Sequence, residues 1–185
     1  GAEAVDQYSL DVLNNDIEVA ADDGIEADFC MHNCRILRNR ITNAFIALSS
    51  QPGLGGPTYF VRNAVYNAVH VAFKLYRDSH GDVLLHNTVV KQGDALAAYT
   101  GERVHALLTR NNLFIGGPPN VRVGQWETGG GQVLSLPTLD LASADMDHDG
   151  LGSEGGLFHG RLGEVGFTGI DQLRTRSRMK HAVWT

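Results

Sequence analysis

The sequence predicts an all-β protein: a parallel β-helix solenoid of about five 24-residue coils, closed by a C-terminal capping tail. Three observations predict this fold class. An asparagine recurs every 24 residues, an aliphatic residue follows two positions later, and a short apolar run precedes it. The recurring asparagines are Asn15, Asn39, Asn63, Asn87 and Asn111.

The apolar runs predict strands. They read DVLN, RILR, YFVR, VLLH and LLTR, and none carries a stripe of period 3.6 long enough for a helix. Second apolar segments, such as residues 45–48 (FIAL) and 69–73 (VHVAF), follow the corners. Two or three short strands per repeat describe one coil, and successive coils should lie about 4.8 Å apart. The positions three before each asparagine should face the core: Val12, Ile36, Phe60, Leu84 and Leu108.

The recurring asparagine has a structural explanation. Asn tolerates the left-handed backbone of a sharp corner, and stacked amides can hydrogen-bond to the coils on either side. The residues before the asparagines should form an outward column. Its arginines, Arg38 and Arg62 among them, could bind an anionic polysaccharide, although an ordinary solvated ladder is the favoured interpretation. The column comprises Asn14, Arg38, Arg62, His86 and Arg110.

After Gly116 the repeat fails. The predicted organisation is therefore parallel β-helix coils over residues 1–125 and a loop and helix cap over residues 126–185, packed on the same domain. Such a cap covers the apolar end and unpaired strand edges of a solenoid. Residues 168–178 predict a short helix, with Thr168 as its cap and Asp171 in its first turn.

Composition and charge exclude several classes. The net charge of −6 argues against a nucleic-acid partner, which needs a basic surface. No apolar run approaches the roughly 18 to 20 residues that span a membrane, and the first residues lack a signal-peptide pattern. Cys30 and Cys34 could close a small disulfide, although two free thiols are favoured, and they lack the partners of a zinc site.

Several motifs carry a family resemblance. They are DDGIEAD at 22–28, NRITNAF at 39–45, GGPTYFVRN at 55–63, FKLY at 73–76 and HNTVV at 86–90. They resemble right-handed parallel β-helix repeat proteins of the pectin-lyase-like superfold, specifically secreted bacterial members with a DDGIE-type coil. The resemblance implies a polysaccharide ligand, calcium in many lyases, and an extracellular or periplasmic location. It does not choose an activity, because the superfold hosts many.

The densest acidic cluster is a candidate catalytic site. It comprises Asp22, Asp23, Glu26 and Asp28. If Ile25 and Ala27 point inward, strand alternation places Glu26 and Asp28 on the coil surface. Paired carboxylates there could act as general acid and base in glycoside hydrolysis, or bind calcium. The alternative is a solvated, turn-forming acidic stretch.

Lys74 is the second catalytic candidate. Two coils later in the chain, it and His70 should project from the same face as Glu26, with Arg77 in the following loop. Abstraction of a proton next to a uronate carboxylate needs a positive group and a base, which suits a lysine beside carboxylates. Asp28, His70, Arg77, Arg38 and Arg62 are the expected substrate-binding residues. The alternative for Lys74 is a loose surface ion pair.

The segment DMDHDG at 145–150 matches the start of a calcium-binding loop. Asp145, Asp147 and Asp149 alternate before Gly150, but Gly156 stands where the loop would need a glutamate. The match is therefore partial, and a plain aspartate-rich turn is the favoured interpretation.

The sequence thus favours a secreted carbohydrate-active protein. Lyase or epimerase chemistry on an acidic polysaccharide comes first and glycoside hydrolysis second, with the catalytic group formed by Asp22, Asp23, Glu26 and Lys74. The competing hypothesis is a non-catalytic polysaccharide-binding or structural module of a larger exported protein. Calcium is the candidate cofactor, and neither nucleic acid nor membrane is an expected partner.

Overall fold

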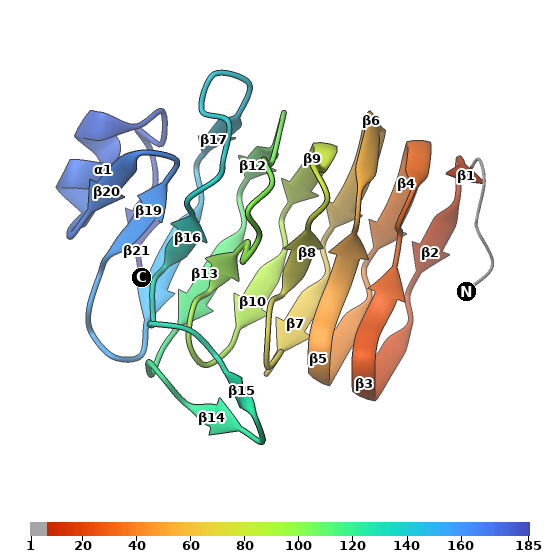
Figure 1. The fold of residues 1–185 in the computed structure, drawn as a ribbon, viewed down its shortest axis with the longest axis horizontal. Helices are drawn as coiled ribbons and strands as arrows, with labels where there is room; N and C mark the ends of the chain where they lie inside the picture. The colour runs from red at the N-terminus through yellow and green to blue at the C-terminus, as the bar shows by residue number, and fades with distance from the viewer. Residues whose placement is uncertain (1–6) are drawn as a thin grey trace.

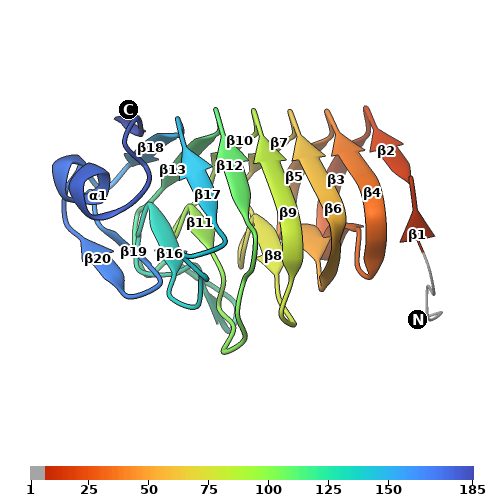
Figure 2. The same cartoon turned by 90° about the horizontal axis from the view of Figure 1, so that it is seen from above.

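In the computed structural model, which describes residues 7–185, the chain winds into a parallel β-solenoid of about six coils (Figure 1). The coils stack in chain order, and helix α1 (Ile170–Arg176) lies at the C-terminal end of the stack (Figures 1 and 2). The predicted all-β parallel solenoid with a short C-terminal helix is confirmed. The sequence predicted about five coils and the structure has about six, because the winding continues beyond the point where the repeat fails.

Parallel pairing between successive coils builds three sheets along the stack. The first contains β1 (Gln7–Tyr8), β2 (Asp11–Leu13), β4 (Cys30–Leu37), β6 (Gly53–Val61), β9 (His80–Leu85), β12 (Leu108–Arg110) and β17 (Asp145–Asp147). The second contains β3 (Asp16–Glu26), β5 (Arg40–Ser50), β7 (Ala64–Tyr66), β8 (Phe73–Leu75), β10 (Thr88–Val90), β13 (Leu113–Gly116), β18 (Gly150–Ser153) and β21 (Val183–Trp184). The third contains β11 (Leu96–Ala97), β16 (Leu134–Leu136) and β19 (Gly160–Leu162), and β20 (Val165–Phe167) adds to it by antiparallel pairing with β19.

Strand β5 bends from one face of the solenoid to the next. Its first residues, Arg40 to Thr42, pair with β7, while its last, Leu48 to Ser50, pair with β8. Strand β3 follows the same path, because Ile17 pairs with Ile41 and Ile25 pairs with Leu48. The ends of β3 and β5 together with β8 therefore form a face of their own, which carries the candidate site.

Stacked aromatic rings fill the solenoid interior. Phe60, Phe73 and Phe114 are fully buried. The ring centroids of Phe60 and Phe73 lie 5.5 Å apart, and those of Phe73 and Phe114 lie 6.5 Å apart, both edge to face. Each such side chain contributes about 1.5–3 kcal/mol of hydrophobic stabilisation.

The recurring asparagines form a buried hydrogen-bond ladder. Asn63 shows the pattern: its Oδ1 accepts from the backbone N–H of Asn39 at 2.9 Å and from the Asn39 side-chain amide at 3.1 Å. Its own Nδ2 donates to the carbonyl of Ile36 and to Asn87 Oδ1. The amide is thus fully satisfied in a site that water does not reach, and it joins neighbouring coils. The predicted stacking of side-chain amides is confirmed for Asn15, Asn39, Asn63 and Asn87.

The fifth member of the ladder is Asn112, and the prediction of Asn111 was wrong. Asn87 donates to Asn112 Oδ1 from both its backbone and its side chain, across 25 residues. The extra residue shifts the register, so Thr109 pairs with Leu84 and takes the core position predicted for Leu108. The ladder then ends on Asp149.

The left-handed residues also differ from the prediction. The ladder asparagines have ordinary φ values, and each preceding residue has a positive φ, for example 54° at Arg38 and 57° at Arg62. The backbone bends one residue before the amide, which leaves the asparagine free to face inward. Arg110 does not join this column, because Asn111 takes its place with φ 56° while Arg110 lies in β12.

Beyond residue 125 the three sheets continue through β16, β17, β18 and β19. A short antiparallel hairpin, β14 (Arg122–Val123) and β15 (Trp126–Glu127), is inserted in the coil between β13 and β16 (Figure 1). Helix α1 lies inside the predicted range of 168–178. Gly169, and not Thr168, precedes it as the cap residue and makes no side-chain cap bond, while the Thr168 N–H donates to Gln172 Oε1.

Cys30 and Cys34 form a disulfide, so the expectation of two free thiols was wrong. In a regular strand residues four apart are separated by about 13 Å. Here Asn33 has a φ of 58°, and the resulting bend brings the two Cα atoms to 6.1 Å.

Within the described chain, no helix is long and apolar enough to cross a membrane.

Candidate functional site

The ends of β3 and β8 bring the predicted acidic and basic residues together. Ile25 and Ala27 are buried, as predicted, so Glu26 projects outward. The register places Glu26 beside Ser49 of β5 and Ser49 beside Lys74 of β8. Because side chains on neighbouring coils stand above one another, these residues share one outer face.

Lys74 and Asp23 form a close ion pair across this face. Lys74 Nζ lies 2.7 Å from Asp23 Oδ2, and the two side chains are 14% and 0% exposed. The other carboxylate oxygen, Asp23 Oδ1, is buried without a hydrogen-bond partner among the described residues. A buried carboxylate needs its counter-charge, so Asp23 holds the lysine ammonium at a fixed position. The loose surface pair considered from the sequence does not describe this geometry.

Glu26 and Asp28 complete a compact group of carboxylates. One ligating oxygen from each of Asp23, Glu26 and Asp28 lies within 4.8 Å of the others. Desolvation raises the pKa of Glu26, and the nearby charges of Asp28 and Asp23 raise it further, while Lys74 opposes them. Desolvation also raises the pKa of Asp28, against hydrogen bonds from Ser49 Oγ at 2.5 Å and the Gln51 N–H at 2.9 Å. A raised pKa makes a carboxylate a stronger base, which favours proton abstraction.

An aromatic group lies beside these charges. His70 stacks on Phe45 with centroids 5.3 Å apart and planes inclined by 5°, and Trp126 of the β14–β15 hairpin lies 4.8 Å from Phe45. Tyr99 lies 5.2 Å from His70. Trp126 and Tyr99 remain 45% and 37% exposed, so their rings are accessible from solvent. We call Phe45, His70, Tyr99 and Trp126 the aromatic platform.

The surroundings of His70 in this platform disfavour its charged form. Desolvation lowers its pKa, and the positive charges of Lys91 and Lys74 lower it further. Burial raises the pKa of Tyr76 to about 12, so its phenol stays protonated. The Tyr76 hydroxyl and His70 Nε2 form a hydrogen bond of 3.1 Å, whose direction is set by the tautomer of the ring.

A buried lysine and aspartate fix the insertion that carries Trp126. Lys91 Nζ donates to three backbone carbonyls, those of Gln92, Asp94 and Thr128. The Asp94 carboxylate accepts from the Tyr99 hydroxyl at 2.7 Å and from the Gln132 N–H at 2.8 Å. Burial lowers the pKa of Lys91 to about 8, against the opposing charge of Asp94. The C-terminal end of the insertion is thus tied to the solenoid at Thr128 and Gln132.

Other predicted residues lie elsewhere. Asp22 is exposed at the edge of the acidic group, and its charge contributes to the raised pKa of Glu26. Arg38 and Arg62 are exposed at the corner that precedes β5 and β7, at the opposite end of β5 from Ser49. Arg77 follows β8, is exposed, and forms no ion pair within residues 7–185.

The three aspartates of the predicted calcium loop occupy three different environments. Asp145 is exposed and pairs with Arg110 at 2.7 Å. Asp149 is buried at the end of the asparagine ladder. Asp147 lies beside His148 and His181. The structure therefore does not bring the three carboxylates together.

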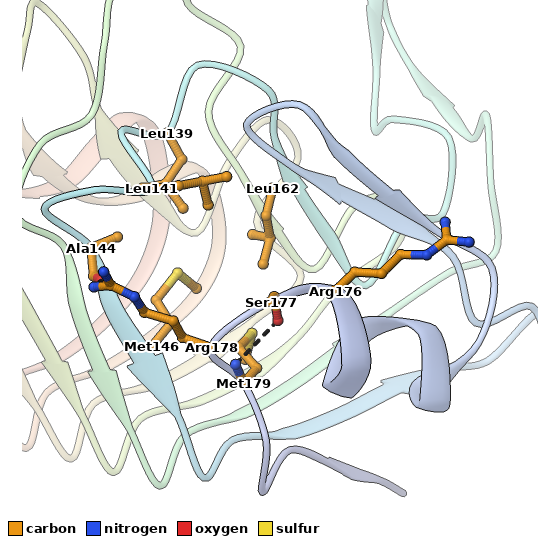
Figure 3. Close-up of a pocket in the computed structure, with 9 residues that line it drawn as sticks. All are labelled: Leu139, Leu141, Ala144, Met146, Leu162, Arg176, Ser177, Arg178 and Met179. Carbon is orange, nitrogen blue, oxygen red and sulfur yellow. Dashed lines mark hydrogen bonds between the residues drawn. The ribbon is translucent and has the colours of Figure 1, made fainter.

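A small apolar cavity of about 150 Å³ lies between the last coils and the C-terminal tail (Figure 3). Leu139, Met146 and Leu162 line it from the solenoid side, and Arg176 points away from it. The two arginines at its rim donate to backbone carbonyls, Arg178 to Ala144 and Arg176 to Gly166. The lining is mainly methyl and thioether groups, which suits packing and not catalysis.

Phe45, Tyr99, Trp126, Asp94 and Lys91 were missed by reasoning from the sequence. The available signal was a tryptophan beside the glycine-rich stretch TGGGQ, inside an insertion that interrupts the repeat. Loops inserted in a regular scaffold are frequent sites of binding residues. No protein-family model, curated protein or solved structure matches this chain. Any function must therefore be inferred from this surface.

Proposed function

We propose that this protein acts on an acidic polysaccharide bound along the face formed by β3, β5 and β8. The observation that carries the proposal is the Lys74–Asp23 pair, which lies beside two carboxyl groups with raised pKa and an exposed aromatic platform. Aromatic rings stack on the apolar faces of sugars, and the lysine offers a fixed positive charge to a uronate carboxylate.

The favoured chemistry is uronate proton abstraction, as in a lyase or an epimerase. Lys74 neutralises the substrate carboxylate, which acidifies the C5–H bond, and Glu26 takes the proton. In elimination the C5–H electron pair forms the C4–C5 double bond, the C4–O bond breaks, and the leaving oxygen takes a proton from water. In epimerisation the proton returns to the opposite side of C5. Asp23 positions Lys74 in both cases.

Inverting hydrolysis fits this geometry less well. An inverting glycosidase needs carboxyl groups about 6.5–9.5 Å apart to admit water. The nearest oxygens of Asp23, Glu26 and Asp28 lie within 4.8 Å of one another. A retaining mechanism needs about 5–5.5 Å and stays the second candidate.

We also propose a structural superfold and a cellular compartment for this protein. The solenoid and its DDGIEAD coil favour the pectin-lyase-like superfold with its right-handed winding. The Cys30–Cys34 disulfide supports an oxidising compartment, either extracellular or periplasmic.

The test is an activity screen on pectate, alginate and glycosaminoglycans, with and without calcium, that follows ultraviolet absorbance of the unsaturated product. Lys74→Ala and Glu26→Gln should each lower kcat/KM by roughly 100-fold or more. Lys180→Ala, an exposed lysine on the cap, is the matched control and should leave it unchanged. Equal turnover in all three variants would contradict the site.

A non-catalytic binding module is the second candidate, and the accessible aromatic platform is the observation that favours it. Tight binding of one of these polymers, with no change in its length, double bonds or stereochemistry, would assign this role.

A further inference from the structure

A second cluster of ligating side chains lies at the other end of the molecule, where the C-terminal tail returns to the last coil. Asp147 ends β17, His148 follows it, and His181 precedes β21. Strand β21 pairs with β18, with Val183 opposite Gly150, and this pairing brings His181 to the β17–β18 turn. The cluster is separate from the acidic group of the proposed site.

The side chains of the cluster converge. One ligating atom from each residue lies within 4.8 Å of the other two. Asp147 Oδ2 is 2.7 Å from His181 Nδ1 and 3.8 Å from His148 Nε2. A tetrahedral ion with ligands at about 2.0–2.1 Å holds them about 3.3 Å apart, so the ligating atoms are close enough and the geometry is reached by rotation of an imidazole ring.

The carboxylate is already oriented for such a role. Asp147 Oδ1 accepts from the backbone N–H groups of His148 at 2.9 Å and His181 at 2.7 Å, which leaves Oδ2 toward the imidazoles. Outer hydrogen bonds of this kind orient metal ligands.

The two imidazoles are accessible, since both side chains are more than half exposed, which leaves a path for an ion and a water ligand. Their rings stack 4.5 Å apart with planes inclined by 4°, so one ring must rotate out of the stack before both nitrogens can point at the same ion. Two nitrogens and one oxygen match zinc or a similar transition metal and not calcium, which takes six to eight oxygens.

We propose that Asp147, His148 and His181 bind one divalent transition-metal ion, with zinc as the representative, and that the ion fastens the C-terminal strand to the last coil. Binding uses the lone pair of His181 Nδ1, so the ion replaces the present hydrogen bond between this nitrogen and Asp147 Oδ2. Because β21 covers the edge of β18, fastening it protects the end of the solenoid.

The experiment is calorimetric titration of chelator-treated protein with zinc chloride, alongside calcium chloride and magnesium chloride. Wild type should bind one equivalent of zinc and neither of the other ions. His148→Ala and His181→Gln should each weaken zinc binding by roughly tenfold or more. His86→Ala is the matched control, because His86 has the same left-handed conformation two coils earlier and is also exposed.

Two spectroscopic readouts separate a true site from loose binding. Cobalt in place of zinc should give the visible absorption of a tetrahedral centre in wild type and in His86→Ala only. Zinc should slow hydrogen exchange of the Val183 and Thr185 amides. The Val183 N–H donates to the Asp149 carbonyl, just before β18, and the Thr185 N–H donates to the Leu151 carbonyl of β18. No zinc binding in wild type, or the same binding in His148→Ala and His181→Gln, would overturn the proposal.

Discussion

Asp149 accepts two hydrogen bonds from Asn112, one from its backbone N–H and one from its side-chain amide, each of 2.8 Å. Its second oxygen accepts from the Thr109 hydroxyl at 2.5 Å. An asparagine at this place would bring two further donors, whereas a carboxylate only accepts. Asp149 therefore completes the ladder at the last coil, where Thr109 supplies the donor that meets it.

This arrangement predicts that Asp149→Ala destabilises the protein by at least about 3 kcal/mol, because it leaves three buried donors unpaired. Asp149→Asn keeps one oxygen for Asn112 and should recover most of the loss. Asp145→Ala, which removes an exposed ion pair, should change stability by less than about 1 kcal/mol. Chemical denaturation measures all three. Equal stability of Asp149→Ala and Asp145→Ala would show that the end of the ladder does not stabilise the fold.

A second prediction concerns pH. Complete burial raises the pKa of Asp82 from 3.8 to about 6, against hydrogen bonds from Ser79 and Ser50. The folded protein therefore holds this proton more tightly than the unfolded chain. The stability from this group is complete below about pH 3.8 and is lost as pH rises through about 6.

Asp82→Asn removes that dependence. Its stability relative to wild type should increase by up to about 3 kcal/mol between about pH 4 and pH 7.5. The raised pKa values of Glu26 and Asp28 are present in both proteins and cancel in the difference. Denaturation curves across this range measure it, and a difference that stays constant with pH would show that Asp82 does not titrate in this range.

A third prediction tests the aromatic platform apart from catalysis. Trp126→Ala removes its exposed ring, and polysaccharide affinity should fall by about tenfold, which corresponds to about 1.4 kcal/mol. Trp184→Ala, at an equally exposed tryptophan on the C-terminal strand, is the matched control. Affinity electrophoresis with the polymer that the screen selects compares them. Equal losses in both variants would mean that the rings act only through general stability.

The disulfide gives a fourth prediction. The loop that it closes is short, with a sequence separation of 4, so the chain-entropy contribution is about 2 kcal/mol. The double variant Cys30→Ala and Cys34→Ala should lose about that amount of unfolding free energy and keep the solenoid signature in circular dichroism. Wild type treated with a reductant in denaturant and refolded without reoxidation should match it. A variant as stable as wild type would show that the bridge does not stabilise the fold.

The sequence predicted the coils because one residue type recurring every 24 positions is typical of a stacked solenoid. It also predicted that Lys74 would meet the acidic group, since counting coils places β8 above β5 and β3. It could not choose between Asn111 and Asn112, because both are asparagines and only the long coil that returns to Asp149 decides the register.

The remaining differences between the predicted and the observed structure have local causes. The Cys30–Cys34 bridge depends on a left-handed bend at Asn33, which spacing alone does not reveal. Trp126 contacts Phe45, far away in the sequence, in an insertion that Lys91 and Asp94 fasten to the solenoid. The pairing of Asp147 with His181 depends on where the tail returns. Each of these contacts arises from loop geometry and not from the repeat.

Asn112 and Asp149 are 37 residues apart in the sequence, yet they form the same hydrogen bonds as Asn39 and Asn63, which are 24 residues apart. Coil length and coil stacking are therefore independent variables in this molecule. Segments of chosen length and chemistry could be grafted between β13 and β16 while the scaffold stays in place, which makes this turn a natural point for engineering new recognition.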